Sequence, residues 1–144
     1  MSKESRSSAA DGALLLIRIA AGLVFIVYGL GKVGNFAGII KTWHALHLPA
    51  GSVMGPIQGI VEFVGGIFLV AGLFTRLCGA LLALDMVGAL LIVRIPHSHF
   101  QGGYALEWQA FMIAIALAIA GAGAFSIDRA MSGGRRSTRR SVAG

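Results

Sequence analysis

Long apolar segments separated by short polar ones dominate the chain and determine its expected architecture. They run over roughly 12–34, 53–73, 77–95 and 104–124. A helix needs about 20 apolar residues to cross the hydrocarbon core of a bilayer, and each segment is close to that length. The pattern therefore predicts an all-α integral membrane protein, built as a bundle of four transmembrane helices.

A shorter amphipathic segment, "NFAGIIKTWHALHLP", connects the first two spans. Helical spacing places its bulky residues along one side: Phe36, Ile39, Ile40, Trp43 and His47. This pattern is typical of a helix lying in the membrane interface, with Trp43 at the depth of the lipid head groups. We expect Pro49 to end this interfacial helix between spans one and two.

Composition supports the membrane assignment and limits the chemistry. The chain is 56% hydrophobic and only 12% charged, and its mean hydropathy is +0.80, which is far too apolar for an ordinary soluble domain. We expect a polar head over 1–11, a transmembrane domain over 12–130 and a disordered basic tail over 131–144. The single cysteine, Cys78, excludes an internal disulfide and a cluster of the usual four-thiolate type. We therefore expect no intrinsic cofactor.

Positive charges predict the orientation in the membrane. In a model with four spans, eight lysines and arginines fall on one side, and Lys41 stands nearly alone in the loops on the other. Because cytoplasmic loops carry the excess of Lys and Arg, both termini should be cytoplasmic, with 35–52 and 96–103 outside. The formal net charge of +6 lies largely in the C-terminal tail. It indicates contact with anionic lipid rather than with nucleic acid.

Small and charged residues share a stripe on each of the first two spans, so these stripes should face protein. They are Arg18, Gly22, Phe25, Gly29 and Lys32 in the first span, and Gly55, Gly59, Glu62, Gly66 and Leu69 in the second. The third span carries Leu81, Asp85, Gly88 and Ile92 on one common face. Faces of small residues allow close approach of helix backbones within a membrane.

Charged side chains inside the spans need partners, because an unpaired charge in a bilayer costs about 2.5–3.5 kcal/mol or more. In an antiparallel hairpin of the first two spans, the side chains of Lys32 and Glu62 lean toward each other. Tyr28, one turn from Lys32, could donate to the same carboxylate. Asp85 falls at nearly the depth of Glu62, and Arg18 is the other cation available to it.

The outer ends of the last two spans carry further polar groups. Arg94 and Glu107 should meet there as an ion pair. His97 and His99 lie in the adjoining loop, where we expect hydrogen-bonding or proton-carrying roles. The spacings of these histidines, and of His44 and His47, match no strong metal-binding signature, so we predict no metal site.

Two interpretations of the polar groups remain open. In the first interpretation, buried pairs involving Arg18, Asp85, Arg94 and Glu107 have a purely structural role and fix the helix register. Alternatively, the groups form a ligand-binding or proton-handling pocket near one membrane face. The candidate ligand-binding residues are Tyr28, Lys32, Trp43, Glu62, Asp85, His97, His99 and Glu107. No catalytic residue is identified, and the sequence leaves open whether the protein is an enzyme.

These residues and motifs resemble those of the DoxX family. "LIRIAAGLVFIVYGLGKVGNF" is similar to the family's first span, with Arg18, Gly29 and Lys32 at matching places. "VEFVGGIFLVAGLFTRLCG" is similar to its second span and the turn that follows, and "GAGAFSIDR" resembles its closing segment. The resemblance implies a four-helix protein of bacterial cytoplasmic membranes that is linked to redox systems.

The resemblance also suggests what the pocket binds. Relatives act as membrane subunits of a thiosulfate:quinone oxidoreductase, although this chain carries no fused thiosulfate-handling domain. We therefore expect a membrane subunit that binds quinone or a similar lipid-soluble ligand and works with a partner oxidoreductase. The alternatives are an assembly or anchoring protein whose ion pairs are purely structural, and a small-solute transporter, whose pathway a homo-oligomer could enlarge.

The predicted orientation has a direct test. A cysteine introduced at Ser98 should react with a membrane-impermeant maleimide in intact cells, whereas a cysteine at Ser137 should react only after the cells are opened. The reverse labelling pattern would show that the orientation, and the charge argument behind it, are wrong.

Overall fold

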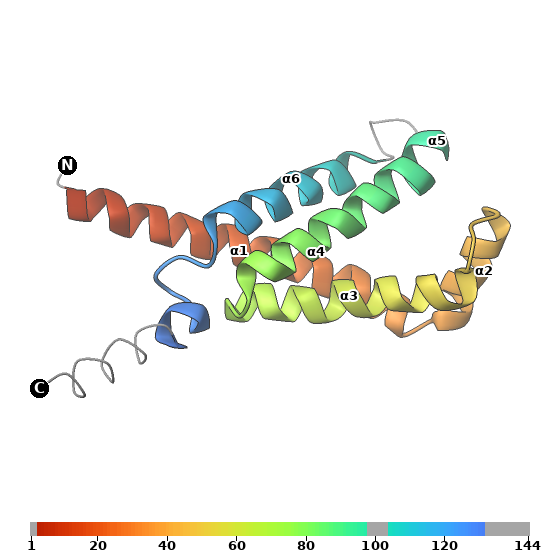
Figure 1. The fold of residues 1–144 in the computed structure, drawn as a ribbon, viewed down its shortest axis with the longest axis horizontal. Helices are drawn as coiled ribbons and strands as arrows, with labels where there is room; N and C mark the ends of the chain where they lie inside the picture. Colours follow the sequence, from red (N-terminus) through yellow and green to blue (C-terminus); the bar gives the residue numbers. More distant parts are fainter. Residues whose placement is uncertain (1–2, 98–103, 132–144) are drawn as a thin grey trace, which may run out of the picture.

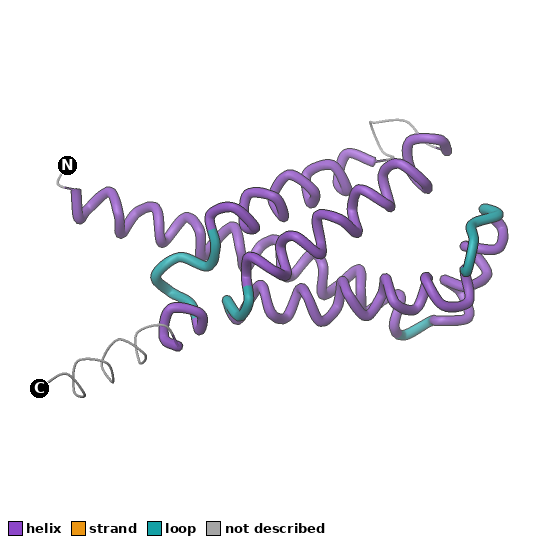
Figure 2. Tube along the Cα trace, viewed as in Figure 1, coloured by secondary structure: helices purple, strands orange, loops and turns teal. Residues whose placement is uncertain are grey.

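The computed structural model describes residues 3–97 and 104–131, and this part of the chain is helical, with no strand (Figures 1 and 2). This confirms the predicted all-α fold. The helices, in chain order, are α1 (Lys3–Val33), α2 (Phe36–Ala45), α3 (Gly51–Ala71), α4 (Thr75–Gly88), the π-helical η1 (Ala89–Arg94), α5 (Ile95–His97) and α6 (Ala105–Ala120).

Within the described ranges 3–97 and 104–131, three helices are long and apolar enough to cross a membrane: Ser8–Val33, Gly51–Ala71 and Thr75–Val93. The fourth apolar helix, α6, has 16 residues and spans about 24 Å, less than a hydrocarbon core of about 30 Å. It ends before the predicted 124 because Gly121 adopts a positive φ of 80°. At the other end of the chain, α1 starts at Lys3 and runs without interruption across residue 12.

The bundle consists of two helix pairs. The most extensive contacts join α1 to α3 and α4 to α6, each pair antiparallel, and the two pairs meet mainly through α3 and α4 (Figure 1). We call the end that carries α2 the α2 end, and the end that carries the α3–α4 connection the turn end. The predicted interfacial helix is α2, and Asn35 caps its N-terminus by accepting a hydrogen bond from Gly38 N at 2.9 Å. The helix ends at Ala45, before the expected Pro49, because the chain has already left the helical conformation at His47, whose φ is 53°.

Glycines bring the backbones of α1 and α3 into direct contact. A Cβ atom on Gly29 would lie 2.3 Å from Phe63 N, and one on Gly66 would lie 2.8 Å from Gly22 O. The faces predicted for the first two spans are confirmed, since every residue named on them is buried except Lys32, which is partly exposed.

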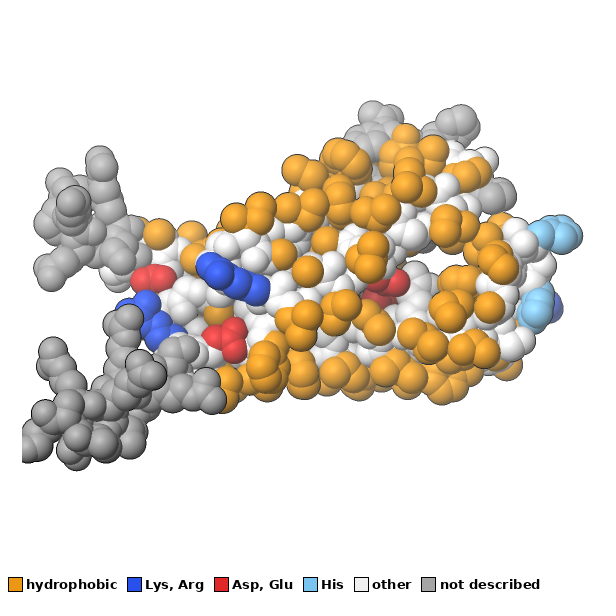
Figure 3. Space-filling model, viewed as in Figure 1, with side chains coloured by type: hydrophobic (Ala, Val, Ile, Leu, Met, Phe, Trp, Pro, Cys, Tyr) orange, Lys and Arg blue, Asp and Glu red, His pale blue; other side chains and the backbone are white. Residues whose placement is uncertain are grey.

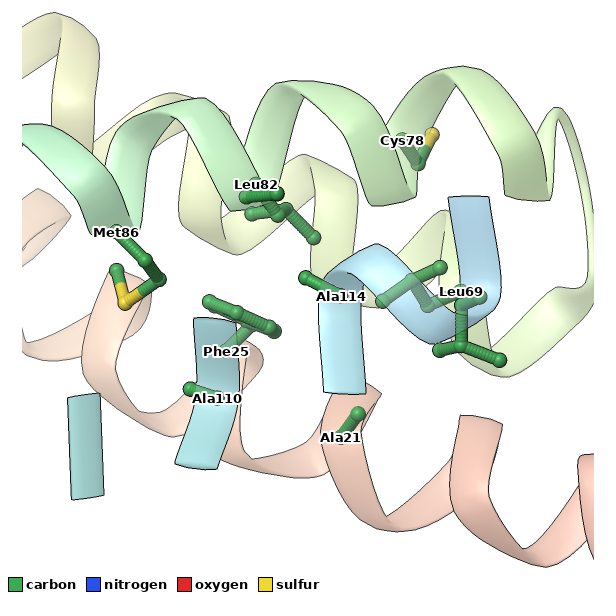
Figure 4. Close-up of a cluster of buried hydrophobic side chains, with 10 residues drawn as sticks. Ala21, Phe25, Leu69, Cys78, Leu82, Met86, Ala110 and Ala114 are labelled. Carbon is green, nitrogen blue, oxygen red and sulfur yellow. The ribbon is translucent and has the colours of Figure 1, made fainter. Parts of the chain in front are cut away.

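The common face of Leu81, Asp85, Gly88 and Ile92 is not the buried face of the third span. Leu81 and Ile92 are 48% and 52% exposed, and the residues of α4 that are buried are Thr75, Cys78, Gly79, Leu82, Ala83 and Met86. The contact with α6 selects this face, because a Cβ on Gly79 would lie 2.8 Å from Ala114 O. Side chains of α4 and α6 then form the apolar core together with those of α1 and α3 (Figure 4).

The turn end is held together by a carboxylate from the end of the described chain. The Asp128 side chain accepts hydrogen bonds from Phe74 N at 2.7 Å and Thr75 N at 3.0 Å. Asp128 N in turn donates to Gly72 O at 3.0 Å. The first N–H groups of α4, which a helix cannot satisfy internally, therefore have partners outside the helix.

The glycine contact predicts the effect of adding one methyl group. Gly29→Ala should destabilise the protein by about 1–3 kcal/mol, because the new Cβ overlaps the backbone of α3. Gly31→Ala is the matched control: it lies two residues away in the same helix, where a Cβ meets nothing within 4 Å. Unfolding of both variants in detergent measures the difference, and equal stabilities would contradict the close contact.

Candidate functional site

A cavity of about 230 Å³ opens between the two helix pairs, toward the α2 end. The space-filling view is hollowed between the pairs, and acidic side-chain atoms are visible in the hollow (Figure 3). Its walls are mainly apolar, with contributions from α1, α2, α3, α4, η1 and α6. The polar or amphipathic side chains in its lining are Tyr28, Lys32, Thr42, Trp43, Gln58, Glu62 and Glu107.

The predicted pairing of Lys32 with Glu62 is present at the cavity wall. Lys32 Nζ lies 2.6 Å from Glu62 Oε1. The Glu62 side chain is 2% exposed and that of Lys32 is 22% exposed. Gly59, one turn from Glu62, makes room for the lysine, because a Cβ there would lie 2.8 Å from Lys32 Cβ. The ammonium can thus reach a carboxylate that is fully buried.

The two carboxyl groups of α3 and α4 are only partly satisfied. Glu62 Oε2 and Asp85 Oδ2 are buried and have no hydrogen-bond partner among the described residues. Asp85 lies outside the cavity lining but interacts electrostatically with Glu62 and Lys32, with Gln58 beside it. Buried polar atoms without partners are uncommon in folded proteins and call for an explanation.

Two aromatic side chains contribute differently to the cavity. Tyr28 is 45% exposed while it lines the cavity, so it lies where the cavity opens. Glu62 Oε2 has no partner, so the hydrogen bond from Tyr28 that the sequence allowed is not formed at that oxygen. Trp43 packs against α3, where a Cβ on Gly51 would lie 2.8 Å from Trp43 Cβ. It forms part of the cavity wall at the α2 end.

Arg18 does not pair with Asp85, contrary to the sequence-based expectation. Its guanidinium donates to Ala122 O and, at 2.7 Å, to Phe125 O. Arg18 lies near the turn end, where the backbone after α6 presents free carbonyls. It therefore ties the segment 121–131 to α1, together with Asp11, which accepts a hydrogen bond from Ala124 N at 2.8 Å.

Of the eight candidate ligand-binding residues, five line the same cavity: Tyr28, Lys32, Trp43, Glu62 and Glu107. Asp85 lies next to them. His99, and the side chains of His97 and Arg94, lie outside the part of the chain that the structure describes, so the proposed Arg94–Glu107 pair stays a prediction.

Gln58 and Thr42 also line the cavity, although neither is among the residues predicted from the sequence. Gln58 had a signal, since it is a polar residue within an apolar span and lies one turn before Glu62. Within the ranges 3–97 and 104–131, no three His, Cys, Asp or Glu side chains come close enough to hold a metal ion. His44 Nε2 instead lies 3.3 Å from Ser52 Oγ.

Comparisons with known proteins place the chain among membrane proteins. The family model DoxX matches residues 13–95. The chain is 32% identical to the Bacillus subtilis protein named "Putative oxidoreductase CatD", over 79% of this chain and 83% of that protein. It is 33% identical to the Escherichia coli inner membrane protein YqjF, over 85% of this chain and 94% of that protein. No solved structure matches the chain.

The Lys32–Glu62 pair predicts a specific pattern of stability changes. Lys32→Met or Glu62→Leu alone should destabilise by about 3–5 kcal/mol, since each breaks the ion pair between Lys32 Nζ and Glu62 Oε1. The double variant should cost much less, with a coupling energy of about 0.5–3 kcal/mol. Lys41→Met, on the exposed face of α2, is the control. A double-mutant cycle measures the coupling, and strictly additive effects would show that the two side chains do not interact.

Proposed function

The chain belongs to the DoxX family of membrane proteins, and we propose that its cavity binds a quinone or a similar lipid-soluble redox ligand for a partner oxidoreductase. The single observation that carries the proposal is the cavity itself. Apolar walls surround a few convergent polar groups, which is the usual form of a small-ligand site. Lys32, Gln58 and Tyr28 carry N–H or O–H donors toward the ligand, and Glu62 holds the lysine in place.

The chemistry of these groups suits the carbonyl oxygens of a quinone. A ring with two carbonyl groups is apolar over most of its surface and accepts hydrogen bonds at its ends. The Lys32 ammonium is a charge-assisted donor, roughly twice as strong as a neutral one. It would stabilise negative charge that develops on a carbonyl oxygen when the ring is reduced.

The size and position of the cavity favour a ligand with a lipid tail. Its volume of about 230 Å³ is below the roughly 300–1,000 Å³ of pockets that enclose a whole drug-sized molecule. A ring-sized head group would fit, while a tail remained in the lipid. The helix pairs meet less extensively than the helices within each pair, and the exposed Tyr28 lies at the opening. We infer that the tail leaves the cavity there.

The name of one relative supports a role within a redox system. The Bacillus subtilis relative is named "Putative oxidoreductase CatD", and the match covers most of both chains. With one cysteine, this chain cannot hold a cluster on four of its own thiolates. In this proposal electrons come from a partner oxidoreductase, and this chain binds and orients the acceptor.

A purely structural role for the ion pair is the second candidate. Lys32 and Glu62 join α1 to α3, the pair of helices with the most extensive contact. A pair at that place would fix the register of the two helices without binding any ligand. The two candidates predict different results for Lys32→Met combined with Glu62→Leu. This double variant should keep its function if the pair is purely structural and lose it if the pair acts on a ligand.

Tryptophan fluorescence provides the test, because the chain has two tryptophans and only Trp43 lines the cavity. In a Trp108→Phe background, a short-tailed ubiquinone analogue should quench Trp43 with a saturable dependence on concentration. In a Trp43→Phe background, quenching of Trp108 should rise linearly, without saturation.

The site residues can be tested in the same assay. Lys32→Met combined with Glu62→Leu, which should keep the fold, should weaken binding at least about tenfold, the equivalent of about 1.4 kcal/mol. Lys41→Met should leave it unchanged. Linear quenching of both tryptophans, with no quinone in lipid extracts of the purified protein, would contradict the proposed function.

A further inference from the structure

We propose that Lys32, Glu62 and Asp85 form an electrically neutral triad that stores one proton on Asp85 and can pass it through Glu62 to a ligand in the cavity. The storage of the proton is independent of the ligand. The delivery step rests on the function proposed above.

The geometry connects three helices. Lys32 extends from α1, Glu62 from α3 and Asp85 from α4, so the triad bridges the two helix pairs. Glu62 uses Oε1 for the ammonium, at 2.6 Å, which leaves Oε2 buried without a partner. Asp85 interacts with Glu62 and also has a buried oxygen without a partner, Oδ2. Glu62 Oε2 and Asp85 Oδ2 lack a hydrogen-bond partner among the described side chains. A proton held between the two carboxyl groups would provide one.

The charges facing the triad require that proton. One cation and two carboxylates would carry a net charge of −1, and an uncompensated charge away from water is costly. The cavity lining, taken over the described residues, supplies no cation besides Lys32; α6 adds a further carboxyl group, Glu107, and α2 adds Thr42 and Trp43. Arg18 cannot compensate, since its guanidinium is bound to carbonyls near the turn end.

The arrangement also determines where the proton is held. Glu62 is in direct contact with the ammonium, which stabilises its ionised form. The ion pair of Lys32 is with Glu62 rather than with Asp85. Asp85 is therefore the group that remains a carboxylic acid. Because Glu62 lines the cavity and Asp85 does not, Glu62 must be the intermediate carrier between Asp85 and a bound ligand.

Each delivery pairs one electron with one proton. When the partner oxidoreductase supplies one electron to a bound quinone, a carbonyl oxygen gains negative charge. Asp85 then gives its proton to the ionised Glu62, which passes a proton on to that oxygen, and the triad is left with a charge of −1. A proton from water then restores Asp85; the Lys32 side chain, 22% exposed, lies on the side from which water can reach the triad.

Infrared spectroscopy of the ligand-free protein tests the stored proton. At neutral pH the difference spectrum between the wild type and Asp85→Asn should show the C=O stretch of one carboxylic acid, shifted by D2O. The assignment is tractable because the chain has six Asp and Glu residues. Asp11→Asn is the matched control: its oxygen still accepts the hydrogen bond from Ala124 N, and the band should remain.

A second variant tests why the proton is there. Glu62→Gln removes one carboxylate, so Lys32 and an ionised Asp85 would balance each other, and the acid band should disappear although Asp85 is still present. A band that persists in Asp85→Asn, or one that persists unchanged in Glu62→Gln, would overturn the proposal. The measurement uses no quinone, so its outcome is independent of whether the cavity binds one.

Discussion

The backbone contact between α1 and α3 is the constraint on which the rest of the molecule depends. Gly29 lies against the backbone of Phe63, and Gly66 lies against that of Gly22, so these two helices cannot carry bulky side chains between them. Close packing on one side brings Lys32 within reach of Glu62. The larger inward-facing side chains of α1 and α3 therefore point toward α4 and α6, where the core and the cavity form.

The faces of the first two spans were predictable because two independent signals agreed on them. Glycine at helical spacing and a charged residue both mark the same stripe, and each must face protein for its own reason. The third span gave a conflicting signal. The charge of Asp85 indicates that its side of the helix faces protein. In the structure, Asp85 lies at the edge of the buried face of α4, next to Glu62. The true face follows Gly79 and Leu82, because α6 packs there.

The site was predictable to the extent that it depends on charge within a span. Lys32, Glu62 and Glu107 had to be withdrawn from lipid, and helix depth placed them near one another. The partners of Arg18 could not be found in this way. They are backbone carbonyls of Ala122 and Phe125, which every residue possesses, so no side-chain pattern marks them. The early end of α6 at Gly121 creates these acceptors.

The hydrogen bonds of Asp128 have a consequence for the biosynthesis of the protein. The N-terminus of α4 is capped by a side chain that lies 53 residues later in the chain than Thr75. When the connection between α3 and α4 leaves the ribosome, this acceptor has not yet emerged. The N–H groups of Phe74 and Thr75 therefore emerge before their partner, and the connection reaches its final form only when the segment 121–131 docks. Maturation of the bundle thus ends at the same place where Arg18 and Asp11 hold the two ends of the described chain together.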